Sequence, residues 1–228
     1  MTRLAAAGRR IAFTYRSNRA QAEETARQVA AAGAEVWCLR EDLASAQRAR
    51  ALVRQVVRRW GGLDILVANA GAAEMRTIHR ISERDWSRLM DLNLKGVFFC
   101  AREALKTMQR QRGGAIVLVG SQAGSTGGFL IGAHYSLSKA SLPTMAKILA
   151  KEGAPYGVRA NCVAPGVIDT DLTRRFPTKA AADLVGRIPL RRKGTAAEVA
   201  DAVAFLGRSA SSYITGITLP VTGGLWMP

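Results

Sequence analysis

The sequence predicts an α/β protein in which a doubly wound, parallel β-sheet forms a single domain over residues 1–228. Three observations predict this fold class. Short apolar runs alternate along the chain with longer segments of helical pattern, as β-α-β units require. Several of these runs are continuously apolar, which is typical of strands buried on both faces of a sheet. Neither a linker nor an internal repeat divides the chain.

The apolar runs are the predicted strands, and the segments between them are the predicted helices. We expect strands over residues 11–15, 35–39, 65–68, 115–120, 159–164 and 217–221. We expect helices near residues 18–32, 45–60, 82–111, 133–153 and 195–207. Ser17, Ser45, Ser82 and Thr195 stand at the N-cap positions of four of these helices. The last two are followed three positions later by an acidic residue, which is the spacing of a capping box.

The formal net charge of +16 restricts the classes of partner. The basic residues are mostly arginine and are spread along the chain, with pairs such as Arg58-Arg59 separated by ordinary globular sequence. We interpret them as solvated helix faces, with docking to an acidic carrier protein as the alternative. A nucleic-acid partner is not expected, because the sequence has no basic stripe or recognition motif.

The cysteines and the apolar stretches indicate a cytoplasmic protein. Cys38, Cys100 and Cys162 stand far apart with neither metal-binding nor disulfide spacing, so we expect buried thiols, a reducing compartment and no metal. No stretch of 18 apolar residues is present, and the apolar stretch near the N-terminus is too short for a signal peptide, so no membrane association is expected.

Tyr135 and Lys139 are four residues apart near the start of the helix predicted over 133–153, which puts them on one helix face. A phenol with a pKa of about 10 is a poor acid–base catalyst at neutral pH. A nearby ammonium favours the phenolate and lowers that pKa. Tyr135 could then act as general acid in ketone reduction or as general base in alcohol oxidation.

Polar side chains follow the ends of the predicted strands, where ligands of doubly wound sheets bind. Ser121 directly follows the strand over 115–120, where it can donate a hydrogen bond to a substrate oxygen held beside Tyr135. The other strand ends are followed by Arg16-Ser17, Asp42, Asn69-Ala70-Gly71 and Pro165-Gly166. A random scatter of polar residues would not follow the strand ends so consistently.

Together these motifs resemble the short-chain dehydrogenase/reductase family, and in particular its 3-oxoacyl-acyl-carrier-protein reductase branch. The matching segments are Tyr15-Arg16-Ser17-Asn18, Asn69-Ala70-Gly71, residues 91–96, Ser121, the Tyr135/Lys139 pair, residues 165–170 and residues 212–216. They occur in the family's order and span residue 16 to the C-terminus. The resemblance implies a Rossmann-type sheet.

The resemblance also implies roles for individual residues. Tyr135 would be the acid–base residue, and Lys139 would lower its pKa and bind the nicotinamide ribose. Ser121 would orient the substrate carbonyl, and Asn93 would bend its helix and hold a water that links Lys139 to solvent. The remaining cofactor contacts implied are Asp42 and Leu43 at the adenine, Asn69, Ala70 and Gly71 along the cofactor, and Pro165, Gly166, Ile168 and Thr170 near the nicotinamide amide and the phosphates.

The choice of cofactor follows from Arg16 and Ser17. In dinucleotide-binding folds an acidic residue at the end of the second strand accepts a hydrogen bond from the ribose 2′-hydroxyl, whereas an arginine accommodates a 2′-phosphate. That place holds Arg16, followed by Ser17. The planar donors of a guanidinium suit a phosphate, so NADP(H) is the predicted cofactor.

The same spacing places the glycine-rich phosphate turn, some 20 residues before Arg16, ahead of Met1. The chain therefore begins inside the family's first helix, and we expect the first strand to be missing from the centre of the sheet. Its two neighbours would be left unpaired or forced together. Three explanations are open: the biological start lies upstream or the chain is truncated, the chain is a degenerate relative, or another element or subunit fills the gap.

The resulting prediction is an NADP(H)-dependent oxidoreductase acting on a carbonyl/alcohol pair, with a 3-oxoacyl thioester as candidate substrate and an acyl carrier protein as candidate partner. The alternative is a non-catalytic or weakly active binding or scaffold subunit without a phosphate loop. The resemblance implies a lid over residues 171–187 and a homotetramer, to which the apolar tail over 219–228 would contribute. Tyr156 stands where carrier-protein reductases often have an arginine, which counts against carrier docking.

Overall fold

The computed structural model describes residues 1–174 and 176–228, and its strands and long helices lie where the sequence predicts them. The strands are β1 (Arg10–Tyr15), β2 (Glu35–Arg40), β3 (Ile65–Ala68), β4 (Gly114–Val119), β5 (Val158–Pro165) and β6 (Thr218–Val221). The α-helices are α1 (Arg19–Ala31), α2 (Ala46–Trp60), α3 (Glu83–Met90), α4 (Val97–Gln111), α5 (Ala123–Thr126), α6 (Ala133–Gly153), α7 (Asp171–Arg174), α8 (Thr178–Gly186) and α9 (Ala196–Gly207). Shorter turns are η1 (Thr2–Leu4), η2 (Ile78–Arg80), η3 (Asp91–Gly96), η4 (Ala154–Tyr156) and η5 (Ser209–Ser211).

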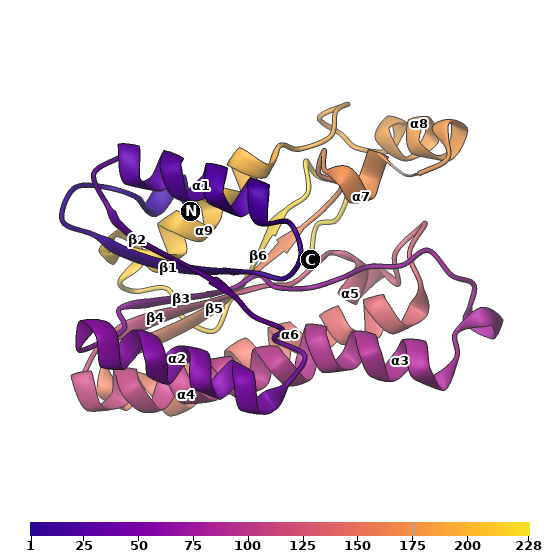
Figure 1. Ribbon diagram of the computed structural model, residues 1–228. Helices are drawn as coiled ribbons and strands as arrows, with labels where there is room; N and C mark the ends of the chain where they lie inside the picture. The colour runs from indigo at the N-terminus through magenta and orange to yellow at the C-terminus, as the bar shows by residue number, and fades with distance from the viewer. Residues whose placement is uncertain (175) are drawn as a thin grey trace.

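The elements form three layers, with the strands in the middle (Figure 1). Helices α1 and α9 cover one face of the strands, and α2, α4 and α6 cover the other. Every pair of neighbouring strands is parallel, from β1–β2 to β5–β6. The prediction of a parallel, doubly wound α/β fold is therefore confirmed.

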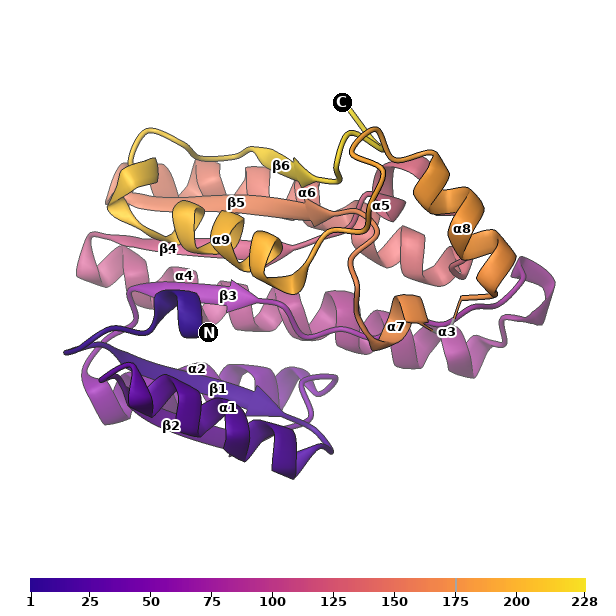
Figure 2. The same cartoon turned by 90° about the horizontal axis from the view of Figure 1, so that it is seen from above.

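The strands divide into two sheets, one of β1 and β2 and one in the order β3-β4-β5-β6. β1 faces β3 across the space between the sheets (Figure 2). Across residues 1–174 and 176–228, no backbone hydrogen bond joins the two strands. The expected gap at the centre of the sheet is present, and its edges are left apart instead of closing on each other.

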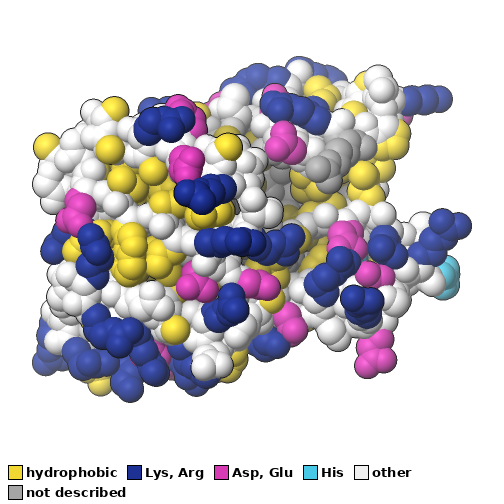
Figure 3. Space-filling model, viewed as in Figure 1, with side chains coloured by type: hydrophobic (Ala, Val, Ile, Leu, Met, Phe, Trp, Pro, Cys, Tyr) yellow, Lys and Arg dark blue, Asp and Glu magenta, His cyan; other side chains and the backbone are white. Residues whose placement is uncertain are grey.

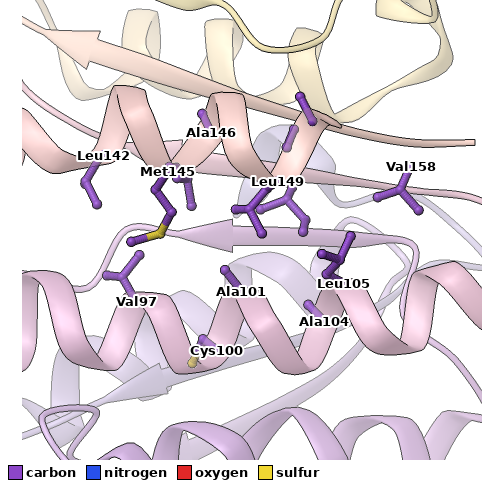
Figure 4. Close-up of a cluster of buried hydrophobic side chains, with 14 of the residues drawn as sticks. Val97, Cys100, Ala101, Ala104, Leu105, Leu142, Met145, Ala146, Leu149 and Val158 are labelled. Carbon is purple, nitrogen blue, oxygen red and sulfur yellow. The ribbon is translucent and has the colours of Figure 1, made fainter. Parts of the chain in front are cut away.

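Helix packing holds the two sheets together beneath this gap. Helix α2, which follows β2, packs against α4, and both contribute to the largest core cluster. An ion pair between Arg54 Nε and Glu103 Oε1, 2.7 Å apart, joins the same helices. Figure 4 shows the centre of this cluster, where small and apolar side chains of α4 such as Ala101 and Leu105 face those of α6 such as Leu142 and Leu149.

Two details differ from the expected elements. The N-cap of α1 is Asn18, whose Oδ1 accepts from Gln21 N at 3.0 Å, and not Ser17, because the helix begins one residue later than the pattern indicated. The helix expected over 82–111 is interrupted by the π-helical turn η3. Within the described part of the chain, no helix is both long and apolar enough to cross a membrane.

Candidate active site

Tyr135 and Lys139 lie in the first two turns of α6, on one face as predicted. Lys139 is 5% exposed, and its Nζ donates to the carbonyl oxygen of Val119, at the end of β4, over 2.8 Å. The same Nζ lies 5.9 Å from the centroid of the Tyr135 ring. The ammonium is therefore held beneath the ring by the end of a central strand.

The pKa values of this pair differ from the sequence prediction. Burial lowers the pKa of the Lys139 ammonium to about 8. Burial raises the pKa of the Tyr135 phenol, and a side-chain hydrogen bond with Ser121 opposes the rise. Burial therefore dominates the pKa of Tyr135 in this structure, and the lowering of that pKa by Lys139 stays a prediction.

Ser121 lies two residues after the end of β4 and two residues before the start of α5. Its Oγ accepts a hydrogen bond from Ala123 N at 3.1 Å, which fixes the side chain on the loop. The next residue, Gln122, donates from its backbone N to Pro165 O at 3.0 Å and so joins the ends of β4 and β5. The hydroxyl of Ser121 and the phenol of Tyr135 thus meet at one end of the four-stranded sheet.

Asn93 is fully buried in the π-helical turn η3. Its side-chain amide pairs with the backbone of Ala72: Nδ2 donates to Ala72 O and Oδ1 accepts from Ala72 N, each at 2.9 Å. The Nδ2 group also donates to Ser138 Oγ at 3.1 Å, and Ser138 Oγ donates to Tyr135 O at 2.7 Å. Asn93 therefore connects the loop after β3 to the helix that carries Tyr135. The water expected beside Asn93 stays a prediction.

The loop after β3 also approaches this group. Asn69 and Gly71 are exposed and Ala70 is half-buried. A Cβ atom on Gly71 would lie 3.2 Å from Asn93 Oδ1 and 3.5 Å from Lys139 Nζ. The missing side chain leaves room immediately beside both groups.

The residues expected at the adenine end follow β1 and β2. Arg16 and Ser17 are exposed at the end of β1, and Arg40 Nε donates to Arg16 O at 3.3 Å. Asp42 Oδ1 accepts from Ala44 N at 3.1 Å, within its own loop. The side chain of Leu43 is half-buried and packs against the largest core cluster, and its adenine contact stays a prediction.

The segment after β5 returns to the same end of the sheet. Pro165 ends β5, and a Cβ atom on Gly166 would lie 2.9 Å from Thr222 Cα, so glycine allows a close approach to the turn after β6. Ile168 is buried and forms a parallel bridge with Gly194. Thr170 is half-buried, with Oγ1 donating to Ile168 O at 3.4 Å. Because Pro165 O accepts from Gln122 N, the start of this segment lies beside the loop that carries Ser121.

The predicted lid corresponds to α7 and α8, with Arg175 outside the described residues. Leu184 packs with Val167 and Ile188, and Leu225 of the C-terminal tail joins that cluster. The guanidinium of Arg187 lies 4.3 Å from the ring centroid of Phe129, in the loop that links Ser121 to Tyr135. In Figure 3 a hollow with apolar side chains at its floor opens between the part of the surface over α7 and α8 and the part over α3.

Comparison with known proteins decides the family. A family model described as "Enoyl-(Acyl carrier protein) reductase" matches residues 2–226. The chain belongs to the short-chain dehydrogenase/reductase family.

Relatives of this short-chain dehydrogenase/reductase agree with that assignment. It is 36% identical to the 3-oxoacyl-(acyl-carrier-protein) reductase FabG of Staphylococcus aureus strain Mu50 over 224 residues, which cover 98% of the chain and 91% of the relative. The FabG of Staphylococcus epidermidis strain RP62A is 34% identical with the same coverage. A solved short-chain dehydrogenase/reductase from Serratia marcescens superposes with a TM-score of 0.91 at 33% identity, covering 98% of the chain and 90% of that structure.

Membership of the short-chain dehydrogenase/reductase family makes the chain an oxidoreductase of a group that uses nicotinamide cofactors. The catalytic candidates predicted from the sequence lie together in the structure, namely Asn93, Ser121, Tyr135 and Lys139. Ser138 was not predicted, although it is fully buried between Asn93 and the backbone of Tyr135. The available signal was its position directly before Lys139, on the same helix turn.

Proposed function

We propose that this chain is an NADP(H)-dependent oxidoreductase that interconverts a carbonyl and an alcohol, with Tyr135 as the general acid in reduction. One observation carries the proposal: the Tyr135 phenol, the Ser121 hydroxyl and the buried Lys139 ammonium converge at the end of β4. An acid, a hydrogen-bond donor and a cation in one buried site can stabilise the negative charge that develops on a carbonyl oxygen during reduction.

Ser121 and Tyr135 have different roles in the proposed reduction. The nicotinamide, when bound, supplies the hydride that reaches the carbonyl carbon. Ser121 donates a hydrogen bond to the carbonyl oxygen, and Tyr135 transfers its phenolic proton to that oxygen, so the product is the neutral alcohol. The raised pKa of Tyr135 keeps the phenol protonated at neutral pH, which is the state that reduction requires. A proton from solvent then restores the phenol.

The residues at this end of the site suit the nicotinamide ribose. A lysine ammonium has three N–H donors. Within residues 1–174 and 176–228, Lys139 donates to one acceptor, Val119 O. Gly71 is exposed and has no side chain to cover the nearby Nζ, which would let ribose hydroxyls approach the remaining donors. Lys139 would hold the ribose and Asn93 would position the helix that carries it.

Two arginines support NADP(H) over NAD(H). Arg16 is exposed at the end of β1, and Arg40, which was not among the predicted site residues, is held beside it by its bond to Arg16 O. Guanidinium groups bind phosphate through paired donors, whereas an NAD-selective site would present a carboxylate.

For the substrate we propose a 3-oxoacyl thioester, with an acyl carrier protein as its carrier. The names of the relatives support this substrate class, and the exposed Phe129 ring with Arg187 beside it suits an acyl chain on an anionic carrier. A cytoplasmic homotetramer completes the proposal. The relatives give no support to a purely structural scaffold.

The test is a comparison of wild type with Tyr135→Phe. We expect wild type to oxidise NADPH in the presence of a 3-oxoacyl thioester, and Tyr135→Phe to lose at least about 100-fold in kcat while binding NADPH equally well, because the proton donor contributes about 100- to 10,000-fold. Absorbance of NADPH reports turnover and its fluorescence reports binding. Tyr156→Phe, on the exposed turn η4, is the matched control. Equal turnover in Tyr135→Phe would remove Tyr135 from the reaction.

A further inference from the structure

Arg187 directly follows α8, and its guanidinium lies 4.3 Å from the ring centroid of Phe129. A cation is attracted to an aromatic face without using a hydrogen-bond acceptor. Across residues 1–174 and 176–228, the Arg187 side chain has neither an ion pair nor a hydrogen bond, although Asp183 lies four residues earlier. The N–H donors of this guanidinium therefore have no protein acceptor in the described part of the chain.

Two other arginines of this region are already neutralised. Arg174 in α7 pairs with Asp169, with Nε and Oδ1 3.2 Å apart. Arg192 pairs with Glu198, with Nη2 and Oε1 2.6 Å apart. Arg187 differs from both, because it stacks on a ring where they bond to carboxylates. Its guanidinium is therefore available to an anionic ligand, which arginine binds through paired donors.

The ring under this cation is connected to the helix that carries Tyr135. Phe129 is partly exposed and belongs to the loop over residues 127–132, between α5 and α6. Ser136 Oγ donates to Gly127 O at 2.7 Å and so fixes the start of that loop. Because Ser136 directly follows Tyr135, the loop that holds Phe129 is bonded to the first turn of the catalytic helix.

The backbone around Arg187 is also fixed. Leu184 and Ile188, on either side of Arg187 in the chain, are buried and pack with Val167 and Leu225. Arg187 itself is exposed. The surface over α7 and α8 borders the hollow with an apolar floor in Figure 3. An apolar hollow beside a helix that ends in an unpaired cation suits a ligand that is apolar in one part and anionic in another.

We propose that Arg187, held on the Phe129 ring, binds an oxyanion that the substrate carries away from its reacting carbonyl. The inference rests on the proposed function, since it adds a recognition site for the 3-oxoacyl thioester. Two groups of such a substrate have this chemistry, namely a phosphate on the arm that bears the thioester and a carboxylate at the far end of the acyl chain. Arg187 then selects among thioesters and takes no part in the proton transfer.

The experiment compares three thioesters of one 3-oxoacyl chain: an uncharged pantetheine ester, its phosphopantetheine counterpart, and a pantetheine ester with a terminal carboxylate on the acyl chain. Absorbance of NADPH gives kcat/KM for each. We expect wild type to prefer one charged ester over the uncharged ester at least about tenfold, because the bonds from a guanidinium to an oxyanion are charge-assisted. Preference for the phosphate identifies the arm as the source of the oxyanion, and preference for the carboxylate identifies the chain end.

Arg187→Met should abolish this preference and leave kcat/KM for the uncharged ester unchanged, because methionine keeps the apolar stem without the donors. Arg174→Met is the matched control, since it removes the same charge from a guanidinium that Asp169 already neutralises. We expect it to retain the wild-type preference. Equal kcat/KM for all three esters in wild type, or an unaltered preference in Arg187→Met, would overturn the proposal.

Binding without turnover separates this site from the proposed reaction. The same three thioesters without the 3-oxo group cannot be reduced, so calorimetry measures their affinity alone. We expect one charged ester to bind wild type at least about tenfold more tightly than the uncharged ester, and Arg187→Met to bind them equally. This pattern without any turnover of the 3-oxo esters would contradict the proposed function while supporting the Arg187 site. Equal affinities in wild type would overturn the site whatever the turnover.

Discussion

The Lys139 ammonium is buried with a single protein acceptor in the described part of the chain, and that arrangement has a measurable cost. Its pKa falls from 10.5 to about 8 on folding, so the unfolded chain binds the proton more tightly than the folded protein. The charged lysine therefore destabilises the fold at every pH below about 8. Between pH 8 and 10.5 the folded state releases its proton first, and the free energy of unfolding rises with pH. Such a cost is expected at a functional residue more than at a structural one.

Lys139→Met should reveal this cost. We expect the free energy of unfolding at pH 7 to rise by about 2 kcal/mol, because a buried charge is replaced by an apolar group of similar length. The gain should shrink as the pH rises toward 10.5. Urea unfolding at pH 7 and pH 10 measures both, with Lys147→Met, an exposed lysine of the same helix, as control. A variant less stable than wild type at pH 7 would show that the bond to Val119 O outweighs the burial.

Arg16 sets the expected cofactor preference. We expect Arg16→Asp to weaken NADPH binding at least about tenfold and to improve NADH binding, since a carboxylate repels the 2′-phosphate and accepts from a 2′-hydroxyl. Fluorescence titration with both cofactors gives the ratio. Arg58→Asp makes the same change of charge near the end of α2, where the next residue, Arg59, pairs with Glu35 at the start of β2, and should leave the ratio unchanged. An unaltered ratio in Arg16→Asp would remove Arg16 from the cofactor site.

At this scale the sequence located the reacting groups better than their environments. Tyr135 and Lys139 could be paired from helix spacing, and Ser121 from its place after a strand. The direction of the Tyr135 pKa shift could not be predicted from the sequence, because it depends on how deeply the phenol is buried and on which acceptor Lys139 reaches. Neither quantity is encoded in the spacing of two residues along a helix.

The turn η3 and the loop after β2 approach each other closely near the site. A Cβ atom on Gly96 would lie 1.9 Å from Leu43 O. Only glycine permits this contact, which holds the Asp42–Leu43 loop against the turn that carries Asn93. The end of β2 and the catalytic centre are thereby connected through two short segments.

Gly96→Ala should push the turn η3 away from the Asp42–Leu43 loop. We expect the free energy of unfolding to fall by about 2 kcal/mol or more, because a backbone atom must move to admit the methyl group. NADPH binding should weaken as the loop shifts. Chemical denaturation and cofactor titration measure the two effects. Gly113→Ala, at a position with no atom near the added methyl, is the control and should be nearly neutral. Wild-type values for both quantities in Gly96→Ala would contradict a close contact between Gly96 and Leu43 O.

Element prediction succeeded where the pattern was local. The capping boxes at Ser82 and Thr195 are present as expected, since they need only side chains three residues apart. The interruption of the helix over 82–111 was less visible, because η3 is helical and preserves the apolar face. The turn η3 also lies against the loop after β2, some fifty residues earlier in the chain, and such a contact cannot be read from a local pattern. The implied bend at Asn93 came from the family resemblance alone.

For the molecule as a whole, the central gap followed from the doubly wound strand order, but its geometry did not. Whether β1 would close on β3 depends on how firmly α2, α4, η1 and α9 hold the two sheets, which is a property of packing.

The positions of the basic side chains on the surface also depend on the fold. Basic side chains gather on the lower left of the surface in Figure 3, where Figure 1 shows α2. Several lie over aromatic rings, including Arg59 at 4.9 Å from the Trp37 centroid.

The central claim is that Tyr135 gives a proton to a carbonyl oxygen as hydride reaches the carbonyl carbon. The most direct test uses NADPH with deuterium at the transferable position and mass spectrometry of the product. We predict that wild type converts a 3-oxoacyl thioester into the 3-hydroxy product with one deuterium on the carbinol carbon, and that Tyr135→Phe forms almost none. Unlabelled alcohol from wild type, or equal labelled product from Tyr135→Phe, would contradict the claim.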